Sequence, residues 1–230
     1  MIGILGGLGP QAAGEFFSRL VDRFAEEGFV PNPHIILNCI PDPGVNTLEE
    51  GQNFNLEPFL KGIRFLIQNS SRLIVMACNT IHIHLQKLRQ LTGFQNILSI
   101  QDAVKIKILP LLGKDKKFCF LSTYLTSKHG LYNFGEEYAN SLIKLTSREQ
   151  FDLDELINNY KMTSNHKCFS EMDQIIQSVI NRVSGEEIIF VPACTEISVL
   201  AAPLNVHKID TMDALIDHAV NSYRLFLKET

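Results

Sequence analysis

Two of the five cysteines, Cys78 and Cys194, lie in similar short motifs, ACNT at 77–80 and ACTE at 193–196. Each cysteine follows an apolar segment that we expect to be a buried strand, and each precedes an expected helix. The free N–H groups and the partial positive charge of a helix N-terminus favour a thiolate and attract a carboxylate. A pair of reactive thiols is therefore the leading candidate for chemistry in this chain.

The two motifs belong to an internal repeat. IVMACNTI at Ile74–Ile81 aligns with FVPACTEI at Phe190–Ile197, an offset of 116 residues. Two further pairs of segments align, one at the same offset (2–7 with 118–123) and one at an offset five residues shorter (99–103 with 210–214). Self-similarity at a fixed spacing predicts two similar halves of about 110 residues each.

Apolar segments alternate with segments of helical periodicity, which predicts parallel sheets joined by crossover helices. Among the helices we expect one over 131–139 and a closing one over 213–228. The predicted fold class is α/β, with two similar parallel-sheet halves related by a pseudo-twofold axis. We place the first half at 1–99 plus 210–230, because the last helix is expected to cross back, and the second half at 100–209.

Two thiols that face each other across a cleft suit one reaction in particular. In doubly wound sheets ligands bind outside the carboxyl ends of the strands, where both cysteines are expected. Inversion of a stereocentre by proton transfer needs a base on one face of the substrate and an acid on the other, and a thiolate with a thiol supplies both. N–H donors nearby would stabilise the carbanion-like intermediate.

Length and composition exclude several function classes. The chain has 230 residues, a net charge of −4, 45% apolar and 20% charged residues, which is typical of a soluble globular protein. It has neither an apolar run of roughly 18 residues nor a Lys/Arg block, so we expect no membrane and no nucleic-acid partner. The odd cysteine count and the absence of a signal-like N-terminus predict reduced thiols in the cytoplasm. No CxxC pair occurs, and we expect no metal site.

The segment GLGPQA at Gly7–Ala12 fits a dinucleotide-binding fingerprint after a strand. However, Pro10 lacks the N–H that a phosphate needs, and the next strand, HIILNCI, ends without an acidic residue for a ribose. We therefore expect the glycines, Gly9 among them, to let the backbone approach a small carboxylate substrate.

The motifs ACNT and ACTE resemble the paired cysteine signatures of the aspartate/glutamate racemase family. GILGGLGP near the N-terminus, STYLTSKHGLY at Ser122–Tyr132 and DTMDA at Asp210–Ala214 are also similar to that family, closest to its aspartate racemase branch. The resemblance implies a cofactor-independent amino-acid racemase with two flavodoxin-like halves, often a homodimer. It implies that Cys78 and Cys194 are the catalytic pair. Residues that it implies hold the carboxylate and amino groups of the substrate are Asn79, Thr80, Thr123 and Thr195.

The sequence departs from this family at the group for the distal carboxylate. Aspartate racemases commonly carry an arginine after a Pro-Asp pair in the first long loop, and here Pro43 stands in its place. The resemblance points to a second basic position near His166 and Lys167, with Lys161 as a competitor. Our hypothesis is that Lys167 binds the distal carboxylate, and the preferred amino acid stays open.

Several alternatives also stay open. Glu196, in the second motif, either orients a helix N-terminus or holds the substrate amine. His82 lies four residues after Cys78 and is either a base for that thiol or a helix-surface or partly buried histidine. The same scaffold could support a Cys-dependent isomerase or decarboxylase of a small dicarboxylate, or a catalytically silent metabolite-binding module. Which thiol serves which enantiomer is also open.

Overall fold

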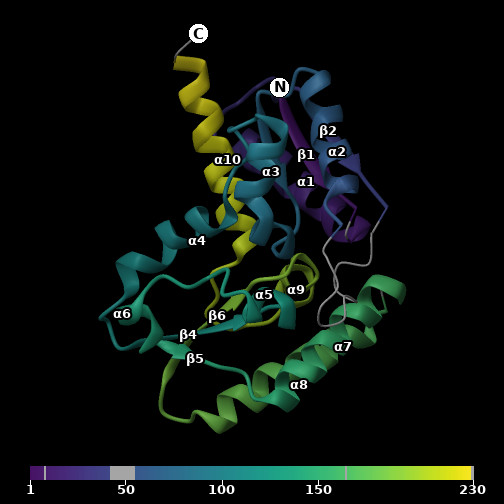
Figure 1. Ribbon diagram of the computed structural model, residues 1–230. Helices are drawn as coiled ribbons and strands as arrows, with labels where there is room; N and C mark the ends of the chain where they lie inside the picture. Colours follow the sequence, from purple (N-terminus) through teal and green to yellow (C-terminus); the bar gives the residue numbers. More distant parts are fainter. Residues whose placement is uncertain (8, 42–54, 164, 229–230) are drawn as a thin grey trace.

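The computed structural model describes residues 1–7, 9–41, 55–163 and 165–228, and each half of the chain builds a three-stranded parallel sheet (Figure 1). In the first sheet the strand order is β2-β1-β3, and in the second it is β5-β4-β6. The strands are β1 (Ile2–Gly6), β2 (Ile35–Cys39), β3 (Leu73–Met76), β4 (Lys116–Leu121), β5 (Leu142–Ile143) and β6 (Glu187–Pro192). The predicted α/β class with two parallel-sheet halves is confirmed.

The two sheets share one register, and it follows the sequence repeat. Ile2 pairs with Leu73 in the first sheet, and Phe118 pairs with Ile189 in the second, so both partners move by the same 116 residues. An additional parallel bridge flanks the third strand of each sheet, Ile74 with Ile97 and Phe190 with Lys208. The bridge partners, Ile97 and Lys208, are 111 residues apart, which is the shorter offset of the third pair of aligned segments. The repeat is therefore present at the level of hydrogen-bonded pairs.

Helices cover the sheets and connect their strands. The helices that come before β4 are α1 (Pro10–Glu26), α2 (Glu57–Gln68), the 3-10 helix η2 (Thr80–His84), α3 (Leu85–Thr92), α4 (Ile100–Ile108) and the 3-10 helix η3 (Leu109–Leu111). Those that come after β4 are α5 (Tyr124–Lys128), α6 (Glu136–Ala139), α7 (Ser147–Thr163), α8 (Lys167–Arg182), α9 (Thr195–Ala201) and α10 (Thr211–Lys228). The helix expected over 131–139 is shorter than predicted: it is limited to α6, and Gly135, with a φ of 105°, directly precedes it.

Three hydrophobic clusters give the molecule its layers. The central cluster contains side chains from both sheets, such as Ile4 and Val191, together with the buried faces of α1, α4 and α10. One outer cluster lies under α2 and α3 on the first sheet, and the other lies under α7 and α8 on the second. Figure 1 shows α10 beside the elements of the first half, which matches its packing against α1 and α4. The shared central core fixes the two sheets relative to each other.

Capping side chains mark the N-termini of α4 and α10. The Ser99 hydroxyl accepts a hydrogen bond from the Asp102 N–H at α4, and the Asp210 carboxylate accepts one from the Met212 N–H at α10.

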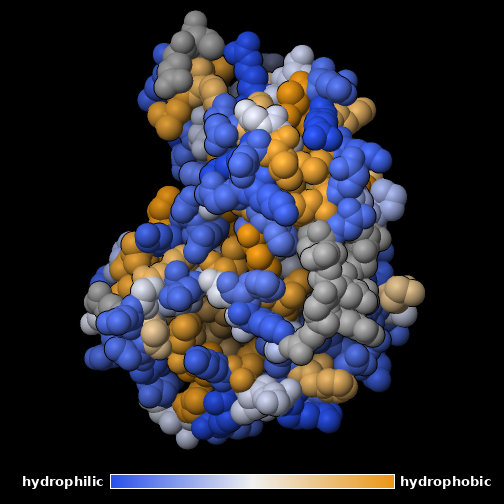
Figure 2. Space-filling view, viewed as in Figure 1, coloured by the Kyte–Doolittle hydropathy of each residue, from blue (hydrophilic) through white to orange (hydrophobic). Residues whose placement is uncertain are grey.

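Within the described residues, no helix combines the length and the apolar character needed to cross a bilayer. The face shown in Figure 2 is mostly hydrophilic, with smaller hydrophobic areas between the polar side chains.

Candidate active site

Cys78 and Cys194 occupy equivalent places at the carboxyl ends of β3 and β6. Each lies two residues beyond its strand, after an alanine whose N–H bonds to the central strand of its sheet: Ala77 to the Leu5 carbonyl and Ala193 to the Leu121 carbonyl, both at 2.9 Å. Cys194 is the residue that precedes the first turn of α9. A negative charge on Cys78 raises the pKa of Cys194, so the two thiols interact electrostatically.

Burial makes both thiols difficult to ionise. It raises the pKa of Cys78 to about 11, although the N–H groups of Ile81 and Thr80 and the charge of Lys161 favour the thiolate. The pKa of Cys194 lies well above its ordinary value because of burial and because of the charge of Glu196 and its hydrogen bond to the thiol. The two thiols therefore have different surroundings: backbone N–H groups favour a thiolate at Cys78, and a carboxylate acceptor holds the proton of Cys194.

Glu196 is a buried carboxylate that accepts hydrogen bonds from both of its neighbours in the second motif. Its Oε2 lies 2.9 Å from Cys194 Sγ and 3.1 Å from Thr195 Oγ1. Its Oε1 lies against Gly9, where an added Cβ would be 1.8 Å away, and has no hydrogen-bond partner among the described residues. Gly9, which directly precedes α1, therefore leaves room for Glu196 at the N-terminus of that helix. We expected Gly9 to let the backbone approach the substrate; in the structure the space beside it is occupied by the Glu196 carboxylate.

Three buried threonines join the two halves. Thr80 Oγ1 lies 3.0 Å from Thr126 Oγ1 and 3.3 Å from Thr123 Oγ1, and Thr123 Oγ1 lies 3.0 Å from Thr126 Oγ1. Thr123 also caps α5 by accepting a hydrogen bond from the Thr126 N–H. Sequence reasoning missed Thr126, although its place three residues after a capping threonine is the signal that would have found it.

Tyr132 is a second residue that sequence reasoning missed. Its hydroxyl donates a short hydrogen bond to Asn79 Oδ1, and charges on both Cys78 and Cys194 act on it. It lies inside STYLTSKHGLY, one of the segments that carry the family resemblance, so the signal was present.

The structure places Lys161, not Lys167, in electrostatic contact with both thiols. The positive charge of Lys161, near the end of α7, lowers the pKa of Cys78 and that of Cys194. Lys167 begins α8 with a side chain that is 75% exposed and paired with Glu171 at 3.2 Å. This position does not fit our hypothesis that Lys167 reaches the cleft. Pro43 lies outside the described residues.

His82 is a buried structural residue. Its Nδ1 accepts a hydrogen bond from the Ile100 N–H and its Nε2 donates one to the Met76 carbonyl, each at 3.3 Å. Both ring nitrogens are thus engaged with the backbone, which leaves no lone pair for the Cys78 thiol. Burial lowers the pKa of His82 to about 4, so the ring is neutral at neutral pH.

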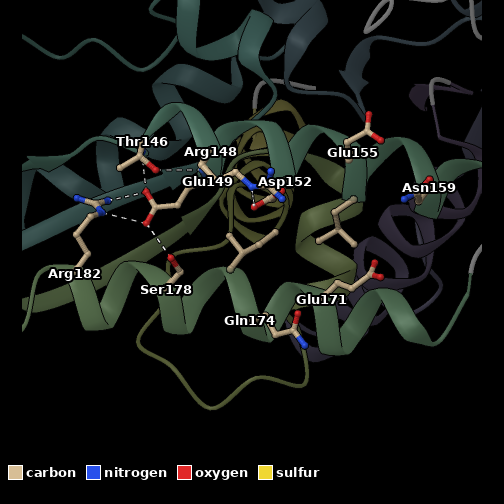
Figure 3. Close-up of a pocket in the computed structure, with 12 residues that line it drawn as sticks. Thr146, Arg148, Glu149, Asp152, Glu155, Asn159, Glu171, Gln174, Ser178 and Arg182 are labelled. Carbon is tan, nitrogen blue, oxygen red and sulfur yellow. Dashed lines mark hydrogen bonds and ion pairs between the residues drawn. The ribbon is translucent and has the colours of Figure 1, made fainter.

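A separate cavity of about 500 Å³ lies between α7 and α8 (Figure 3). Glu149, a buried carboxylate in its lining, accepts hydrogen bonds from Arg182 at 2.9 Å and from the Thr146 N–H at 2.7 Å. No cysteine lines this cavity, which separates it from the site around the two thiols. In the part of the chain that the structure describes, no group of three or more His, Cys, Asp or Glu side chains is placed to hold a metal ion.

The chain is similar in sequence to known racemases. The model of the Asp/Glu/hydantoin racemase family matches residues 5–219. The broad-specificity amino-acid racemase RacX of Bacillus subtilis (strain 168) is 20% identical over 229 residues, which cover 97% of this chain and 98% of that protein.

Solved structures share the fold. An aspartate racemase from Picrophilus torridus superposes with a TM-score of 0.76 at 24% identity, over 96% of this chain and 93% of that one. A glutamate racemase from Francisella tularensis subsp. tularensis SCHU S4, solved with D-glutamate, gives a TM-score of 0.63 at 16% identity, over 99% and 81% of the two chains.

The contact between Gly9 and Glu196 predicts how Cys194 titrates. Glu196→Gln removes the negative charge beside the thiol and should lower the pKa of Cys194 by about one unit. Gly9→Ala should act in the same direction, because the new methyl group displaces the carboxylate. The measurement is the pH midpoint of Cys194 alkylation, followed by mass spectrometry.

Gly14→Ala is the matched control for this experiment. Gly14 lies on the exposed side of α1 and an added Cβ meets nothing within 4 Å, so the midpoint should not move. An unchanged midpoint in Glu196→Gln would contradict the assigned hydrogen bond.

The burial of His82 predicts a loss of stability in acid. Between its ordinary pKa and about 4 the unfolded chain binds a proton that the folded chain does not, so the free energy of unfolding falls as the pH falls. The loss from this residue is about 3 kcal/mol at pH 4. In His82→Gln the free energy of unfolding, from urea titrations, should depend less on pH over this range. His34→Gln, at an exposed histidine, should keep the wild-type dependence.

Proposed function

The chain belongs to the Asp/Glu/hydantoin racemase family, and from this premise we propose that it racemises an acidic amino acid without a cofactor, with Cys78 and Cys194 as acid and base. The protein is an isomerase of the racemase type. The observation that carries the proposed mechanism is the equivalent position of the two cysteines, one at the end of each sheet, together with their mutual electrostatic interaction.

The proton transfers proceed in two balanced steps. A thiolate removes the α-proton, so the Cα–H bond breaks, its electron pair stays on the substrate, and an S–H bond forms. The opposite thiol then gives its proton to the other face of Cα, and the roles of the two sulfurs are exchanged. Backbone N–H groups of Ile81 and Thr80 favour a thiolate at Cys78, whereas Cys194 donates its proton to Glu196, so we assign Cys78 as the base and Cys194 as the acid of the first step.

We propose that Lys161 binds the distal carboxylate of the substrate. Its charge acts on both thiols from α7, whereas Lys167 points into solvent. The residues that the family resemblance brought to the site keep their proposed roles around the amino and carboxylate groups: Asn79, Thr80, Thr123 and Thr195. Assembly as a homodimer stays a prediction.

Both thiols should be required for racemisation. Cys78→Ala and Cys194→Ala should each lower the rate by at least about 10²-fold, since each removes one acid–base group. Each variant should still exchange the α-proton of one enantiomer with deuterium from the solvent, because one base remains. Chiral chromatography and NMR in D2O measure the two reactions on aspartate and glutamate.

Cys39→Ala, at an exposed cysteine, is the control and should behave like wild type. Full racemisation by either active-site variant would refute the two-base mechanism. Conversion of a dicarboxylate without α-proton exchange would instead indicate a different isomerase or a decarboxylase.

Lys161→Ala should lower kcat/KM for aspartate about 30-fold or more, because the distal carboxylate loses its cation. The substitution also removes a charge that favours both thiolates, so every substrate should slow down to some extent. The ratio of kcat/KM for aspartate to that for alanine isolates the carboxylate contact and should fall. Lys167→Ala is the matched control and should leave the ratio unchanged. The opposite pattern would restore Lys167 as the binding residue.

A further inference from the structure

Asn79 carries the one polar group of the first cysteine motif that still needs a partner in this structure. Its side chain is 2% exposed, and its Nδ2 has no hydrogen-bond acceptor among the described residues. A buried amide donor without an acceptor is unfavourable, so its presence in a site points to a ligand that supplies the acceptor.

The other polar side chains around the cysteines are already engaged. Thr80, Thr123 and Thr126 bond to one another. The Thr195 hydroxyl donates its proton to the carboxylate of Glu196. Glu196 is a hydrogen-bond acceptor, so it cannot donate a hydrogen bond to a substrate carboxylate. Among these residues, Asn79 is therefore the one whose donor is available to the α-carboxylate, whereas the threonine oxygens can still accept hydrogen bonds from the substrate amine.

The orientation of the Asn79 amide is set from the second half of the chain. Tyr132, in the segment between α5 and α6, donates its hydroxyl proton to Asn79 Oδ1. Its pKa is raised well above the ordinary value, first by burial, so the phenol stays protonated and acts as a donor. With Oδ1 held by the phenol, Nδ2 occupies the other branch of the planar amide.

The ring of Tyr132 is itself fixed by an aromatic cluster. Its centroid lies 5.0 Å from that of Phe120 and 6.3 Å from that of Phe134. Tyr138 packs on the same two rings, at 5.9 Å and 4.9 Å, but its hydroxyl has no partner among the described residues. The cluster thus holds two buried tyrosines, of which Tyr132 alone bonds to the cysteine motif.

We propose that Tyr132 is a positioning residue that holds the Asn79 amide with its Nδ2 toward the α-carboxylate of the amino-acid substrate. This inference rests on the proposed function and extends it to a residue outside both cysteine motifs. Tyr132 does not touch the reacting atoms. By donating its proton to Oδ1 it favours the orientation in which Nδ2 faces the carboxylate, since the amide oxygen and the carboxylate oxygens would repel each other.

The test is the substitution Tyr132→Phe, which keeps the ring and removes only the hydroxyl. The Kd for racemic aspartate, measured by calorimetry so that no net turnover occurs, should rise about tenfold, and KM should rise with it. The value of kcat should change less than about threefold, because the contact is present in the ground state and the transition state alike.

Tyr138→Phe is the matched control. It removes a buried hydroxyl from the same cluster and should leave Kd and KM unchanged. In the Asn79→Ala background, Tyr132→Phe should have no further effect on Kd, since its action passes through the amide. Thermal unfolding checks that each variant is folded.

An unchanged Kd in Tyr132→Phe, an equal rise in Tyr138→Phe, or independent effects of Tyr132→Phe and Asn79→Ala would overturn the inference. Failure of the proposed function has a different signature: wild-type protein that binds aspartate but does not exchange its α-proton in D2O. Wild-type protein that binds no amino acid at all would overturn both.

Discussion

The carboxyl ends of β3 and β6 have to converge for the proposed chemistry, because each sheet supplies one cysteine of the proposed pair. This constraint is met by the central hydrophobic cluster, which contains side chains of both sheets and packs α1, α4 and α10 between them. The hydrogen bond between Thr80 and Thr126 links the same two halves beside the cysteines.

The convergence has an electrostatic consequence. Burial disfavours both thiolates, and the groups around them distinguish the two sulfurs. Cys78 has backbone N–H donors, whereas Cys194 has a carboxylate acceptor in Glu196. Two halves with one register thus provide chemically different partners, as proton transfer between opposite faces of a substrate requires. The lysine whose charge acts on both sulfurs, Lys161, belongs to α7 of the second half.

Departures from the repeat lie where the two halves meet. The second motif has Glu196 where the first has Thr80, and Gly9 provides the space for that carboxylate at the start of α1. Tyr132 comes from a segment that two glycines keep out of helical conformation, and this irregular backbone brings its hydroxyl to Asn79. These contacts are therefore differences between two otherwise similar halves.

The two parallel-sheet halves, and the position of Cys78 and Cys194 at matching strand ends, could be predicted from the amino-acid sequence. These features depend on local periodicity and on an offset that can be found by comparing the chain with itself. Three contacts became known from the folded structure: Glu196 lies against Gly9, the charge of Lys161 rather than that of Lys167 acts on the thiols, and Tyr132 bonds to Asn79. Such contacts join residues far apart in the chain, and periodicity within each half does not specify how side chains of one half meet those of the other.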